Sequence, residues 1–199
     1  MVRESSISRQ TTETSIDLHL LIDGTGIADI QSGNGFMDHM LTLFTRHGLF
    51  DLTLRCDGDT HVDFHHSAED IGICLGQAFA KSLGDHKGIF RYGHAYVPMD
   101  ESLVRVCADL CGRPNLIYEV ALIDRKIGEF ESDLAQDFFK ALVDHAGATM
   151  HVDLLRGRNS HHALEAVFKA SGRALGHCCS INPRASDHVM STKGVIDKR

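Results

Sequence analysis

One short pattern occurs twice in this chain and limits its fold more than any other feature. The segments DFHHSAEDIG and NSHHALEAVF both contain His-His-x-x-Glu just before an apolar helical pattern. When His65 is placed on His161, an offset of 96 residues, Glu69 falls on Glu165 and the glycines and apolar positions that follow also coincide. We interpret this as an internal duplication in which two halves share one plan.

A second aligned stretch lies upstream of each histidine pair. A two-residue gap changes the offset to 98 and places DHMLTLFTRHGLFDLTL over QDFFKALVDHAGATMHV, so that His39 falls on Asp137 and His47 on His145. Chance identity over short windows is the alternative. It explains less well why the spacing of several elements recurs together.

Hydrophobic periodicity predicts strands and two helices in each half. In the first half we expect strands at SIDLHLLID and LFDLTLRC, a helix at GFMDHMLTLFTRHG that Gly48 closes in a left-handed conformation, and a helix from His66 to about Leu83. In the second half we expect strands at HAYVPMD, SLVRVCADL, NLIYEVALI and ATMHVDLL, a helix around DLAQDFFKALVDHAG, and a last helix from about Ser160 to Leu175.

These elements predict an α+β fold made of two tandem pseudo-symmetric halves, with helices packed on one side of the sheets. The predicted divisions are residues 1–86 for the first half, 87–184 for the second, and 185–199 for a C-terminal tail, to which the family resemblance described below gives a part in the active site. We expect a single compact unit.

Charge and composition exclude several classes of protein. A net charge of -7 disfavours a nucleic-acid binder, which needs a basic stripe. No apolar run approaches the ~20 residues of a membrane span, and the polar N-terminus carries no secretory signal. The six cysteines show no CxxC spacing, so we expect reduced thiols that serve mostly as packing groups in a cytoplasmic protein. The cysteines also lack the spacing that a metal site with four thiolate ligands requires.

The fourteen histidines point toward metal or proton chemistry. In a helix, residues three and four apart share a face, so each HHxxE motif can direct a histidine and its glutamate to one ion. Imidazoles with a carboxylate suit Mn, Fe, Co, Ni or Zn. Adjacent histidines point about 100° apart on a helix of 3.6 residues per turn, so each pair can place one ring at each of two sites. His39 and Asp137 can complete the two sets. The simpler alternative is a polar helix start with acids favoured by the dipole.

Basic residues with glycine, serine or threonine neighbours predict an anionic substrate, a phosphate or a carboxylate. They are Arg91, Arg113, Lys169 and Lys193. Each alone is more often a solvated charge. The acids of PMDESL suit a turn or cap at least as well as a functional role.

Several segments together resemble the imidazoleglycerol-phosphate dehydratase family, in its monofunctional form. They are GNGFMDHMLTLFTRHGLFDL, GDTHVDFHHSAEDIGICLGQA, KGIFRYGHAYVPMDESL, GRPN, NSHHALEAVFKASGRAL and STKG. The resemblance implies that each half has the ribosomal protein S5 domain 2-like fold. It also implies a lyase of histidine biosynthesis that converts imidazoleglycerol phosphate to imidazole-acetol phosphate and water. The implied assembly is a 24-subunit homo-oligomer with two Mn²⁺ per active site, formed where subunits meet.

The resemblance also implies roles for individual residues. Proton transfer is assigned to Glu13, Glu69 and Glu165. The metal ligands are His39, His65, His66, Glu69, Asp137, His161, His162 and Glu165. The substrate-binding residues are Glu13, His39, His47, His65, Glu69, Arg91, Arg113, His161, Lys169, Ser191, Thr192 and Lys193. One position departs from many members of the family, which carry His at Asp137, while other members are acidic there. An oxygen ligand at this position would shift metal preference toward Mn.

Metal chemistry fits the implied reaction. The carbon-bound proton has no adjacent carbonyl, so a carboxylate alone would remove it very slowly. Two metals on the ring nitrogens would favour an imidazolate that expels the neighbouring hydroxyl through a diazafulvene-like intermediate. Two other functions stay open, a di-metal hydrolase of a phosphorylated small molecule and a metal storage protein. Histidines confined to two related helices disfavour storage.

Overall fold

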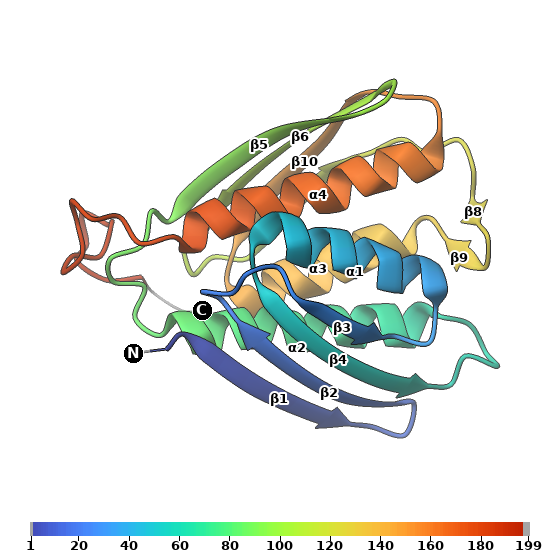
Figure 1. Ribbon diagram of the computed structural model, residues 1–199, viewed down its shortest axis with the longest axis horizontal. Helices are drawn as coiled ribbons and strands as arrows, with labels where there is room; N and C mark the ends of the chain where they lie inside the picture. Colours follow the sequence, from blue (N-terminus) through green and yellow to red (C-terminus); the bar gives the residue numbers. More distant parts are fainter. Residues whose placement is uncertain (1, 197–199) are drawn as a thin grey trace.

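Each half of the chain folds into one four-stranded sheet with two helices (Figure 1). The computed structural model describes residues 2–196. The elements of the first half are β1 (Glu4–Gln10), β2 (Thr14–Leu21), β3 (Ala28–Gln31), α1 (Gly35–Gly48), β4 (Asp51–Gly58) and α2 (His65–Leu83). Those of the second half are β5 (Tyr92–Met99), β6 (Ser102–Asp109), β7 (Asn115–Glu119), β8 (Lys126–Ile127), β9 (Phe130–Glu131), α3 (Leu134–Ala146), β10 (Thr149–Arg156) and α4 (Ser160–Cys179).

The two sheets have the same topology, as a duplication requires. Their strand orders are β1-β2-β4-β3 and β5-β6-β10-β7. In each sheet the last pair, β4 with β3 or β10 with β7, is parallel and the other pairs are antiparallel. Burial alternates along β6, where Val104, Val106 and Ala108 face inward. This alternation indicates a sheet that is covered on one face. The predicted α+β fold with two related halves is confirmed.

The four helices of the described chain lie between the sheets (Figure 1). In the first half α2 packs on β1 and β2 and α1 packs beside β3; in the second, α4 packs on β5 and β6 and α3 on β7. Helices therefore cover one face of each sheet, as predicted. The two helical layers then meet across the halves, α1 against α4 and α2 against α3.

Glycines allow these helix pairs to approach closely. A Cβ added at Gly72 of α2 would lie 2.5 Å from the Phe138 carbonyl oxygen of α3, and one at Gly172 of α4 would lie 2.2 Å from the Phe44 carbonyl oxygen of α1. Any larger residue would push the helices apart. Because α1 carries His39 and α4 carries the second histidine pair, this packing sets the distance between them.

Helix α1 ends differently from the prediction. The left-handed residue is Leu49, with φ 58°, whereas Gly48 is the last residue of the helix. A Cβ at Gly48 would lie 2.3 Å from the Phe50 ring and 3.0 Å from the Gly172 carbonyl oxygen. Gly48 is thus needed for contact with the other half rather than for the cap.

Four strands were missed by the sequence analysis, β1, β3, β8 and β9, and the last helix is longer than predicted. Strands β8 and β9 have only two residues each. Strand β1 has mostly exposed or half-exposed side chains, so it shows no apolar alternation, and β3 has only four residues. Helix α4 continues to Cys179. The tail folds back beside the segment that precedes β5, where Gly88 donates to the His188 carbonyl. Residues 197–199 of the predicted tail lie outside the described residues.

The six cysteines are all free thiols. Burial raises the pKa of Cys74 and that of Cys179 to about 12, so both stay protonated and unreactive at neutral pH. We expect Ellman's reagent at pH 8 to modify at most two thiols of the native chain, the half-buried Cys56 and Cys107. In denaturant all six should react. A third fast thiol in the native protein would contradict this packing.

No helix within residues 2–196 combines the length and the apolar character that crossing a membrane requires.

Candidate functional site

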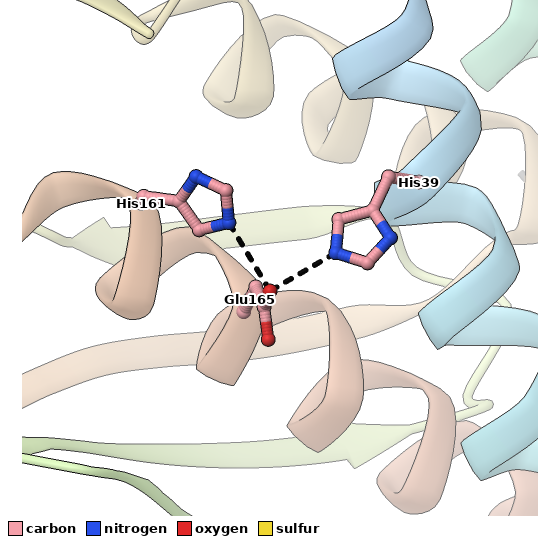
Figure 2. A group of neighbouring side chains, drawn as sticks. All are labelled: His39, His161 and Glu165. Carbon is pink, nitrogen blue, oxygen red and sulfur yellow. Dashed lines mark hydrogen bonds and ion pairs between the residues drawn. The ribbon is translucent and has the colours of Figure 1, made fainter.

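His39 of α1 meets His161 and Glu165 of α4 between the two halves (Figure 2). The Nε2 atoms of the two rings lie 2.9 Å and 3.1 Å from the same oxygen, Oε1 of Glu165. One donor atom from each residue falls within 4.8 Å of the others. We call these three residues the α1–α4 cluster. The other oxygen of Glu165, Oε2, accepts from Lys169 Nζ at 2.5 Å.

The surroundings of Glu165 keep it ionised. Burial disfavours the charged carboxylate, but the Lys169 ammonium and the His39 ring outweigh this and lower the pKa of Glu165 to about 2. Its side chain is only 10% exposed, whereas those of His39 and His161 are 45% and 43% exposed. The cluster therefore presents one fixed negative charge and two imidazoles.

This donor set fits a divalent transition metal. Metal–nitrogen and metal–oxygen bonds are about 2.1 Å, so two ligands at right angles around one ion lie about 3.0 Å apart. The nitrogen–oxygen separations of 2.9 Å and 3.1 Å are close to that value. Imidazoles with a carboxylate favour Mn, Fe, Co, Ni or Zn over Ca or Mg.

The equivalent residues of the other helix pair form a looser group, which we call the α2–α3 cluster. His65 Nδ1 of α2 lies 3.6 Å from the Oδ2 atom of Asp137 on α3. Glu69, one turn after His65, is exposed. The structure thus brings Asp137 to the first histidine of the first pair, as it brings His39 to the first histidine of the second.

An insertion in the second half lies beside the α1–α4 cluster. The hairpin β8–β9 has no counterpart among the described elements of the first half. Its tip, residues 127–129, lines a cavity of about 510 Å³ with His39 and His161. Phe36 stacks edge-on against His161 and also contacts Phe130 of β9.

The second histidine of each pair points elsewhere. The ring planes within each pair are inclined at 86° to each other. That each pair serves two metal sites stays a prediction. His66 Nδ1 lies 3.0 Å from Asp59 and its Nε2 lies 3.9 Å from Glu13. Contact with Asp59 raises the pKa of His66.

His162 has a similar environment in the other half. Its Nδ1 lies 2.9 Å from Glu101 and its Nε2 lies 3.9 Å from Asp100. Contact with Glu101 raises the pKa of His162, and the same contact lowers that of Glu101. The sequence analysis left PMDESL undecided and did not single out Asp59. The duplication offered a signal for Glu101. This residue directly precedes β6, just as Glu13 directly precedes β2, the equivalent strand of the first half.

A basic pocket of about 740 Å³ collects most of the predicted anion-binding residues, a size typical of small-molecule sites. Arg91 is buried; its Nε and Nη2 donate to Asp109 at 2.7 Å and 3.0 Å, and its Nη1 donates to the Met190 carbonyl. The predicted residues that line the pocket are Arg91, Arg113, Ser191, Thr192 and Lys193. Arg184 and His188, which were not predicted, also line it.

The basic pocket and the α1–α4 cluster lie at opposite ends of α4. The backbone N–H of Arg91 donates to the Cys178 carbonyl, 17 residues after His161 (178 − 161). At 1.5 Å per residue the two are about 25 Å apart along the helix. Lys169 is at the cluster rather than in the pocket. His47 lines a third cavity with Arg173 and His177.

The chain is similar to known proteins over nearly its whole length. The imidazoleglycerol-phosphate dehydratase family model matches residues 32–175. The imidazoleglycerol-phosphate dehydratase of Heliobacterium modesticaldum is 53% identical over 195 residues, 98% of this chain and 100% of that protein. That of Alkalilimnicola ehrlichii is 53% identical over 196 residues, with the same coverage.

Solved structures agree with the sequence comparisons. The crystal structure of imidazoleglycerol-phosphate dehydratase from Staphylococcus aureus has a TM-score of 0.82 and 40% identity, and covers 90% of this chain and 99% of that one. The crystal structure of imidazoleglycerol-phosphate dehydratase (IGPD) from Pyrococcus furiosus also has a TM-score of 0.82, with 33% identity, and covers 95% of this chain and 99% of that one. With its duplicated fold and its two histidine–carboxylate clusters, the chain belongs to the imidazoleglycerol-phosphate dehydratase family, a family of hydro-lyases.

Proposed function

We propose that this protein converts imidazoleglycerol phosphate to imidazole-acetol phosphate and water in histidine biosynthesis, with two Mn²⁺ ions per active site. The observation that carries the proposal is the α1–α4 cluster, whose two imidazoles and ionised carboxylate lie at ligand separations. The related α2–α3 cluster supplies a second ligand set. Family membership supplies the substrate.

The proposed ligands divide between the two clusters. His39, His161 and Glu165 would hold one ion, and His65, Glu69 and Asp137 the other. His66 and His162, whose rings point away from both clusters, would complete these sets from another copy of the chain. When bound, two divalent metals act as Lewis acids that favour loss of the imidazole N–H proton, and the electron density left in the ring can expel the hydroxyl on the neighbouring carbon.

The three glutamates differ in their freedom to move a proton. Glu165 is held by two histidines and a lysine, which favours a ligand role. Glu13 has a half-exposed side chain 3.9 Å from His66, and Glu69 is also exposed. We therefore propose that Glu13, and Glu69 in addition to its ligand role, exchange protons with substrate carbon and oxygen atoms, acting as general acids and bases.

The basic pocket would bind the phosphate group. Arg113, Ser191, Thr192 and Lys193 offer the donors that a phosphate needs. Arg91 is already engaged by Asp109 and holds the chain at Met190, so its contribution is to shape the pocket. A separation of about 25 Å along α4 is too long for one small substrate, at 1.5 Å rise per residue. A complete site therefore needs a second copy of the chain, which agrees with the proposed 24-subunit homo-oligomer.

An assay of purified, Mn²⁺-loaded protein tests the function. The expected result is formation of imidazole-acetol phosphate that stops on treatment with a chelator and returns when Mn²⁺ is added. Protein that holds metal but forms no product would overturn the dehydratase proposal. Phosphate release in the same samples would then indicate the di-metal hydrolase.

Two alanine variants test the two-cluster arrangement. His65→Ala and His161→Ala are each expected to reduce bound Mn²⁺ from two ions to one per chain and to cost most of the activity, because each removes an imidazole from a different set. Elemental analysis after gel filtration measures the metal. His19→Ala is the control, since His19 is on β2 and its ion pair is with Glu4 of β1. Full metal content in either cluster variant would exclude two sites.

A further inference from the structure

The second histidine of each pair is held by a carboxylate, and the two carboxylates come from different elements. His66 Nδ1 lies 3.0 Å from Asp59, which follows β4. His162 Nδ1 lies 2.9 Å from Glu101, in the turn between β5 and β6. The duplication does not relate Asp59 to Glu101, so the same contact is built twice in different ways.

This contact determines which ring nitrogen can bind a metal. An ionised carboxylate only accepts hydrogen bonds, so the nitrogen beside it must carry the proton. In a neutral imidazole the other nitrogen then holds the free electron pair. For His66 and His162 the free pair is therefore on Nε2, the atom that faces away from Asp59 and Glu101.

Glu101 is itself fixed by the loop that leads into α4. Its Oε1 accepts from the backbone N–H of Asn159 at 2.9 Å and of Arg158 at 3.3 Å, while Oε2 faces His162. Asn159 also caps the helix, with its side chain accepting from the N–H of His161 and His162. One rigid network thus orients the carboxylate and the ring together.

We propose that Glu101 and Asp59 are positioning residues that hold His162 and His66 with the proton on Nδ1, so that each ring ligates a metal through Nε2. This inference rests on the proposed two-metal function. Carboxylates that hold metal-binding histidines in this way fix the ring and make the ligand more basic. Each acid would act through the histidine that it contacts.

The Glu101→Gln variant separates this role from a purely structural one. The glutamine carbonyl can still accept the two backbone N–H groups, so the loop and the fold should be kept. Its NH₂ group would face His162 Nδ1 and donate to it, which moves the ring proton to Nε2 and blocks the ligand. We expect Mn²⁺ affinity at the affected site to fall 10- to 100-fold, as is typical when such a partner is lost.

The measurement is Mn²⁺ competition against a chromophoric chelator, with the thermal midpoint of the metal-free protein as a second readout. Glu4→Gln is the matched control, because Glu4 Oε2 lies 3.3 Å from His19 Nε2 far from both clusters. It should leave metal affinity unchanged. Asp59→Asn should weaken metal binding in the same direction as Glu101→Gln.

Three results would overturn the inference. The first is Glu101→Gln protein that binds both ions with wild-type affinity. The second is a loss of affinity matched by an equal fall in the metal-free thermal midpoint, which would indicate a structural role. In both cases wild-type protein that binds Mn²⁺ and forms product leaves the proposed function intact. The third, wild-type protein that binds no metal, would remove the proposed function as well.

Discussion

Replacing Glu165 with glutamine is expected to lower kcat/KM about a thousand-fold, equal to roughly 4 kcal/mol of transition-state stabilisation. Glu165 is the one carboxylate of the α1–α4 cluster, and it also accepts from Lys169. A neutral amide cannot offset the charge of a metal ion. It would also leave the Lys169 ammonium without its anionic partner, so both metal binding and local charge balance are lost together.

Steady-state kinetics and metal analysis of the same preparation check this result. The variant should retain one Mn²⁺ per chain, at the α2–α3 cluster, and the far-ultraviolet circular dichroism of wild-type protein. Glu119→Gln makes the same chemical change at an exposed position of β7 and should leave kcat/KM unaltered. Activity within tenfold of wild type would mean that Glu165 is not a ligand.

Replacing Gly172 with alanine is expected to destabilise the fold by about 3 kcal/mol, the cost of overpacking a tight contact. The new Cβ would lie 2.2 Å from the Phe44 carbonyl oxygen and 3.1 Å from the Gly48 nitrogen, both backbone atoms of α1. Backbone atoms cannot rotate away, so the helices must separate. For a chain of this size the thermal midpoint should fall by about 6–12 °C.

The same substitution should also weaken metal binding, because α1 carries His39 and α4 carries its two partners. Differential scanning calorimetry measures the first effect and chelator competition the second. Gly35→Ala is the control: it lies in the first turn of α1 with nothing within 4 Å of the added Cβ. A Gly172→Ala protein as stable as the Gly35→Ala protein would show that the two helices are not in such close contact.

The repeated motif predicted the equivalence of residues but not their contacts. Alignment of the halves related His39 to Asp137 and His65 to His161, and the structure confirms that these residues occupy related positions. Contacts, however, cross between the halves: His39 of the first half meets His161 of the second. The alignment could not show this, because packing between helices depends on surfaces that come together only in the folded chain.

The two motifs also differ in ways that their letters do not show. Glu165 and Glu69 hold the same place in HHxxE, yet Glu165 is buried with three partners and Glu69 is exposed. The hairpin β8–β9 and Phe36 lie beside the first cluster, and no described element of the first half repeats that hairpin. The same motif therefore has different surroundings in the two halves.

The features that the sequence determined by itself are those that depend on residues close together in the chain. Helical spacing and duplication were readable because residues three and four apart share a helix face in any context. These patterns were sufficient to predict the fold class and the equivalence of the two histidine motifs, whereas the ligand sets stay a prediction. Only the tertiary structure decided which helices pack together and which contacts lower the pKa of Glu165. It also placed the basic pocket about 25 Å along α4 from the α1–α4 cluster. Those outcomes depend on glycine contacts and burial between segments that lie far apart in the sequence, which no local pattern encodes.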